Sequence, residues 1–71
     1  MITKYILLRE IDGEVVFDIL SLKELCERIV GLNKGIIYTR EGELVVAFSE
    51  HNIKINRDMQ SFPEKLIKSL F

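Results

Sequence analysis

The sequence has few of the residues that usually cross-link a small domain or form a reactive site. Its 71 residues include one cysteine, one histidine, one proline and no tryptophan. A single cysteine cannot form a disulfide within the chain, so the apolar core must hold this domain together. Nothing in this cysteine usage indicates an oxidising compartment, and we expect a cytoplasmic protein.

The sequence also lacks an excess of one charge and any long apolar run. Ten basic and 11 acidic residues give a formal net charge of −1, which argues against the concentrated positive field of a nucleic-acid-binding surface. No apolar run approaches the ~20 residues needed to cross a bilayer. The apolar run at residues 1–8 contains Lys4, and no small-residue cleavage pattern follows it. We therefore expect neither a membrane span nor a targeting segment.

Residue patterns typical of catalysis or metal binding are absent. His51 has no second histidine or cysteine at ligand spacing, and Cys26 falls on the apolar stripe of a predicted helix. Glu10, Asp12 and Glu14 surround a predicted turn, where turn geometry and solubility explain them. The four glycines lack the spacing of a phosphate-binding loop. We expect no catalytic residue, no metal, no cofactor and no enzymatic activity.

The segment 20–31 predicts the helix around which the chain is organised. Ser21 can cap its first turn while Glu24 reaches back to the Ser21 N–H, and Leu20 can pack on Leu25 as a hydrophobic staple. Gly31 is expected to end the helix. Its apolar stripe has helical spacing and comprises Leu22, Leu25, Cys26, Ile29 and Val30.

A β-hairpin is predicted before this helix, with strands at 2–11 and 14–19. Asp12-Gly13 favours a two-residue turn in which both residues have positive φ, so Ile11 is expected to face Glu14. One side of this hairpin is then the more apolar one, and we expect it to receive the helix: Ile6, Leu8, Val15, Phe17 and Ile19. The other side carries Tyr5, Leu7, Arg9, Val16 and Asp18.

A second hairpin is predicted after the helix, with strands at 36–40 and 43–48 around Glu41-Gly42. Glutamate is a poor occupant of a type I′ turn, so a type I turn with a bulge is an equal alternative that would shift the pairing by one residue. Leu44, Val46 and Phe48 are expected on the core side of the later strand.

The remaining segments predict a short edge strand at 53–55 and a second helix that opens at Ser61, with Pro63 in its first turn. Phe62, Leu66 and Leu70 are expected on its apolar face. The whole chain, 1–71, is thus predicted as one α+β domain in the order ββαββ(β)α. Its four- to five-stranded, mainly antiparallel sheet should pack against two helices that lie on one face.

The sheet face that the helices leave bare is the predicted functional surface. We expect a small non-enzymatic protein-interaction or regulatory module that forms a homodimer, or binds another protein, through seven residues: Tyr5, Leu7, Val16, Ile36, Tyr38, Val45 and Ala47. Alternatively, the second helix covers this face and the protein is a monomer. A further alternative is a nucleic-acid-binding protein, disfavoured by interspersed acidic residues, that uses Lys34, Arg40, Lys54 and Arg57.

Overall fold

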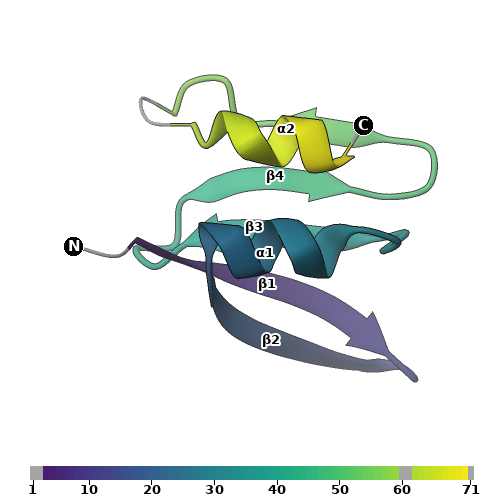
Figure 1. Cartoon of the computed structure of the whole chain (residues 1–71). Coiled ribbons are helices and arrows are strands. Elements are labelled where there is room, and N and C mark those ends of the chain that lie inside the picture. The colour runs from purple at the N-terminus through teal and green to yellow at the C-terminus, as the bar shows by residue number, and fades with distance from the viewer. Residues whose placement is uncertain (1–2, 60–61, 71) are drawn as a thin grey trace.

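A computed structural model describes residues 3–59 and 62–70. This part of the chain folds into a five-stranded antiparallel sheet with both helices on one face (Figure 1). The elements follow the order β1 (Lys4–Ile11), β2 (Glu14–Ser21), α1 (Leu22–Ile29), β3 (Gly35–Thr39), β4 (Leu44–Phe48), β5 (Ile53–Ile55) and α2 (Glu64–Leu70). The α+β class and the placement of both helices on one face are as predicted.

The strands lie in the order β2-β1-β3-β4-β5, so the first hairpin joins the second through β1 and β3. The β1–β2 register is the predicted one, with Ile11 opposite Glu14 and Leu8 opposite Phe17. Asp12 and Gly13 have φ values of 51° and 83°, as a two-residue type I′ turn requires. The turn residues therefore fix the register of the whole hairpin.

Helix α1 begins with the predicted capping box. The Glu24 N–H donates to the Ser21 hydroxyl at 3.3 Å, and the Ser21 N–H donates to the Glu24 carboxylate at 3.1 Å. Gly31 follows the helix with a φ of 84°, a conformation that glycine adopts without strain. Val30 departs from the prediction, because it caps the helix in an extended conformation and is exposed rather than part of the apolar stripe.

The prediction of which hairpin side receives the helices was wrong. Tyr5, Leu7 and Leu20 are buried in the core with Leu25, whereas the side that includes Phe17 is exposed. The physical reason lies at the end of β2. Side chains alternate along a strand, and Leu20, one residue before the helix cap, points to the same side as Tyr5, its cross-strand partner. Burying Leu20 under α1 therefore brings Tyr5 and Leu7 into the core.

The second hairpin contains the bulge that the sequence left open as an alternative. Ile37 pairs with Val46 and Tyr38 pairs with Leu44, which leaves Val45 without a partner between them. As a result both Val45 and Val46 are buried. The prediction for Val46 and Phe48 is confirmed, but Val45 occupies the core position expected for Leu44.

The last two elements complete the core. Strand β5 forms the predicted short edge strand beside β4, and Leu66 of α2 is fully buried against the sheet. Phe62 and Leu70 pack against the same core, while the predicted cap Ser61 lies outside the described residues. Within residues 3–59 and 62–70, neither helix is long and apolar enough to cross a bilayer.

Candidate interaction surface

The structure divides the seven residues of the predicted interaction surface between the two sheet faces. Three are buried in the core beneath the helices: Tyr5, Leu7 and Val45. Val16 is half-buried and shares their side of the hairpin. Burial also raises the pKa of the Tyr5 hydroxyl above its usual value, which favours its neutral form. The other three, Ile36, Tyr38 and Ala47, do lie together on the face opposite the helices.

We call this uncovered side of the sheet the open face. Cross-strand pairing aligns its apolar side chains in two adjoining rows. One row runs across β2, β1, β3 and β4 through Ile19, Ile6, Tyr38 and Leu44. The other runs across the same four strands through Phe17, Leu8, Ile36 and Ala47. Val15 extends the surface along β2, so nine apolar residues form one continuous patch.

The most exposed part of the open face lies on β2. Val15 is 69% and Phe17 65% exposed, and Ile19 is also exposed. The six other members are half-buried, since neighbours in a cross-strand row cover one another's flanks. An antiparallel sheet with one solvated face normally alternates apolar and polar residues, and here β2 presents apolar side chains to water. An exposed apolar patch of this kind is typical of a protein–protein contact.

Charged residues stand at the margins of the open face rather than within it. Lys4 and Glu10 lie at opposite ends of β1, and Lys54 lies beyond Ala47 on β5. Beside Glu10, a shallow depression of about 290 Å³ is lined mainly by apolar atoms of Leu8, Val15, Ile36 and their neighbours. Charged side chains therefore border the patch at both ends of β1 and on β5, as is usual around a protein interface, whereas its margin on β2 is apolar.

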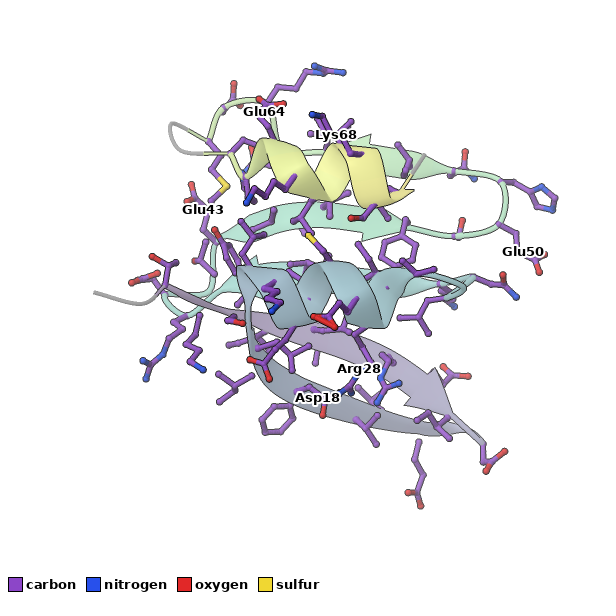
Figure 2. The ribbon with its side chains drawn as sticks, viewed as in Figure 1. Asp18, Arg28, Glu43, Glu50, Glu64 and Lys68 are labelled. Carbon is purple, nitrogen blue, oxygen red and sulfur yellow. The ribbon has the colours of Figure 1, made fainter. Side chains whose placement is uncertain are left out.

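An ion-pair cluster on the helix side ties α1 to the first hairpin. Asp18 of β2 accepts from Arg9 at 3.0 Å and from Arg28 of α1 at 3.4 Å. Figure 2 shows Asp18 and Arg28 beside each other at the flank of the helix. This cluster neutralises the one charged side chain in the middle of β2. The cluster links α1 to the hairpin. Arg28 stays partly exposed, and Arg9 donates to Asp18 through a terminal nitrogen while its Nε is buried without a hydrogen-bond partner among the described residues.

The four basic residues of the nucleic-acid alternative do not converge on one place. Lys34 precedes β3 and Arg40 follows it, so they lie at opposite ends of a five-residue strand, roughly 20 Å apart at ~3.3 Å per residue. Arg57 follows β5, which runs in the same direction as β3, and so lies toward the Arg40 end. Lys54 is on the β5 edge. The arrangement is a dispersed set of charges rather than a patch.

The residues considered for chemistry stay apart from one another. His51 is exposed in the β4–β5 turn, and its Nε2 lies 3.9 Å from the carboxylate of Glu50, which is also exposed. Cys26 is a free thiol that is half-buried against the core. Among the described residues, no group of three or more histidine, cysteine, aspartate or glutamate side chains is placed to hold a metal ion.

Comparisons with known proteins identify no relative of this chain. The sequence matches no protein-family model and no curated protein, and the fold matches no solved structure. Function must therefore be argued from the surface itself.

Six of the nine members of the open face were not predicted to lie there: Ile6, Leu8, Val15, Phe17, Ile19 and Leu44. The first five were expected in the core because they form the more apolar side of the hairpin. The signal that identifies their true side is the staple residue Leu20, which must face the helix and lies on the opposite side of β2 from Ile19.

Proposed function

We propose that the protein is a small non-enzymatic protein-interaction or regulatory module that associates with a second copy of itself through the open face. The observation that carries this proposal is the continuous apolar patch across β1 to β4, with Val15 and Phe17 about two-thirds exposed. In a chain of 71 residues, a single core supplies only a small net stability. Covering this patch would bury further apolar area and so add to that stability.

The size of the face fits a reversible dimer. Five strands at ~4.8 Å spacing, each on the order of 20 Å long, outline a face of roughly 500 Å². Two such faces bury roughly 1,000 Å² in total, the area at which specific interfaces begin. The expected association is therefore of the weaker, concentration-dependent kind. We also propose a cytoplasmic location, which the free thiol of Cys26 supports.

Two valines provide a matched pair of variants for the test. Val15 lies on the open face and Val30 at the end of α1, and they are 69% and 68% exposed. Each would be changed to lysine, and light scattering would follow the average mass from micromolar to millimolar concentration. The proposal requires that the wild type and Val30→Lys dimerise as concentration rises, while Val15→Lys remains at the monomer mass of 8.3 kDa.

A wild type that stays at the monomer mass throughout the concentration series contradicts the proposal. Equal loss of association in both lysine variants contradicts it too, because the effect would then follow from exposed apolar area in general rather than from the open face. Urea titration of each variant checks that the fold is intact, since exposed substitutions of this kind change stability by about 0.5 kcal/mol or less.

A further inference from the structure

The two edges of the sheet are protected very differently. Strand β5 is three residues long and carries Lys54 at its centre, and both features discourage pairing with another strand. Strand β2 is eight residues long, contains neither proline nor lysine, and forms the opposite edge. Figure 1 shows it along the lower border of the sheet. Its single central charge, Asp18, is neutralised by two arginines.

The backbone groups on the free edge of β2 can be assigned from the hairpin turn. A two-residue turn is closed by a hydrogen-bonded pair, here Ile11 and Glu14. Antiparallel pairs then alternate, so every second residue of β2 from Glu14 bonds to β1. The residues between them point their N–H and C=O groups outward: Val15, Phe17, Ile19 and Ser21.

The helix cap confirms this alternation independently. The Ser21 N–H, which the pattern directs away from β1, donates to the Glu24 carboxylate at 3.1 Å. Because Ser21 is used by the cap, three residues of β2 still direct their backbone N–H and C=O groups away from β1: Val15, Phe17 and Ile19. These are the same three residues whose side chains are exposed on the open face. Among the described residues, backbone groups without a partner and exposed apolar side chains thus occur together on this strand.

We infer that a second copy of the chain pairs with β2 along this edge, antiparallel, with Phe17 opposite the partner's Phe17. This register places Val15 opposite the partner's Ile19 and joins the two sheets into one of ten strands. It uses all three outward positions of each copy, which gives six hydrogen bonds across the new edge by the antiparallel pattern. A register shifted by two residues would instead engage either Ser21, whose N–H is already taken by Glu24, or Gly13, which lies in the turn outside β2.

Strand β2 is complementary to itself in this register. Apolar side chains meet on the open face, and on the helix side Asp18 comes opposite Val16 of the partner subunit, so no like charges lie directly across from each other. The two Asp18 carboxylates become diagonal neighbours, each held by its own Arg9 and Arg28. This self-complementarity identifies a second copy, rather than an unrelated strand, as the occupant of the edge.

Edge pairing is a different contact from stacking of the open faces, because it joins the two open faces side by side without covering them. Amide hydrogen exchange on the unmodified protein distinguishes the two contacts. Edge pairing slows exchange at Val15, Phe17 and Ile19 by about tenfold or more as the protein concentration rises. The amides of Val16 and Asp18, already bonded to β1, serve as internal controls and change no more than the rest of the sheet. Stacking of open faces has no such alternating effect.

Cysteine cross-linking provides a second measurement, made in a Cys26→Ser background. Directly opposite residues in a hydrogen-bonded pair have Cα atoms ~5.5 Å apart, within disulfide range, whereas stacked sheets lie ~10 Å apart. Phe17→Cys is therefore expected to form disulfide-linked dimers. Val15→Cys, which faces the partner subunit's Ile19, is not.

The outcomes distinguish this inference from the proposed function. If light scattering shows a dimer but the Val15, Phe17 and Ile19 amides gain no protection, edge pairing is refuted and association through the open face stands. If Val15→Cys cross-links to itself as readily as Phe17→Cys, the register is refuted. A monomer at every concentration refutes both.

Discussion

Leu7 and Leu8 offer a direct test of the face assignment, since they are adjacent leucines on one strand and point to opposite sides of the sheet. Leu7 is 0% exposed and lies in the core, whereas Leu8 is half-buried on the open face. Replacing leucine by alanine removes three carbon atoms, worth about 2.4 kcal/mol of transfer free energy when fully buried. At Leu7 a closed cavity adds to this, and we expect a loss of about 3–5 kcal/mol.

At Leu8 the same change removes about half as much buried area and leaves no closed cavity, so we expect a loss of about 1 kcal/mol. Domains of 71 residues have a total stability of about 4–11 kcal/mol, so Leu7→Ala brings the protein close to unfolding. Urea titration at low protein concentration measures both losses, and with a slope of ~1 kcal/mol per molar the midpoints fall by about 3–5 M for Leu7→Ala and about 1 M for Leu8→Ala. Leu7→Val provides a milder variant should Leu7→Ala fail to fold. Equal losses, or a larger loss at Leu8, would show that the helices cover the other face.

Three further results are expected. Gly35→Ala destabilises the fold, because its new Cβ would lie 2.9 Å from the buried Phe48 ring; the thermal midpoint should fall, and should recover partly in a Phe48→Leu background. The Ser21 backbone N–H, followed by the Ser21 hydroxyl, lowers the pKa of the Glu24 carboxyl, so its stabilising effect is present above the unfolded-state pKa and is lost as pH falls through the lowered folded-state value. The stability difference between wild type and Glu24→Gln should shrink across that acidic window, and a pH-independent difference would argue against the titration. Cys26 should react with a thiol reagent markedly more slowly in the native state than in urea, and equal rates would place it outside the core.

Local chemistry allowed much of the fold to be predicted. Asp12 and Gly13 determine the hairpin turn and hence the whole β1–β2 register, and both were recognised from residue type alone. The Ser21 and Glu24 capping box determines where α1 begins. These features depend on contacts between residues close in sequence, which explains why they could be predicted.

The face assignment failed because alternation alone does not say which side of a strand is inside. Both sides of the first hairpin carry apolar residues, and the more apolar side was taken as the core. The side that faces the core is determined by a contact outside the hairpin, because Leu20 must pack against Leu25 on the other side of the helix cap. In β4 the bulge exchanged the sides of two residues, Leu44 and Val45, a result of the Gly42 turn that the sequence left open between two geometries.

The wrong face assignment and the proposed function have the same physical origin. The alternating pattern of β2, with Val15, Phe17 and Ile19 on one side, is typical of a strand that is half-buried in a core, and in the isolated chain that side faces water. Solvated faces in antiparallel sheets are normally polar, and edge strands normally carry lysine or proline, yet β2 has neither protection while β5 carries Lys54. An apolar pattern without a partner in its own chain is accounted for if a second copy supplies that partner. Substitutions at these three positions should therefore weaken self-association much more than they lower the stability of the monomer, whereas substitutions at Tyr5 and Leu7 should do the reverse.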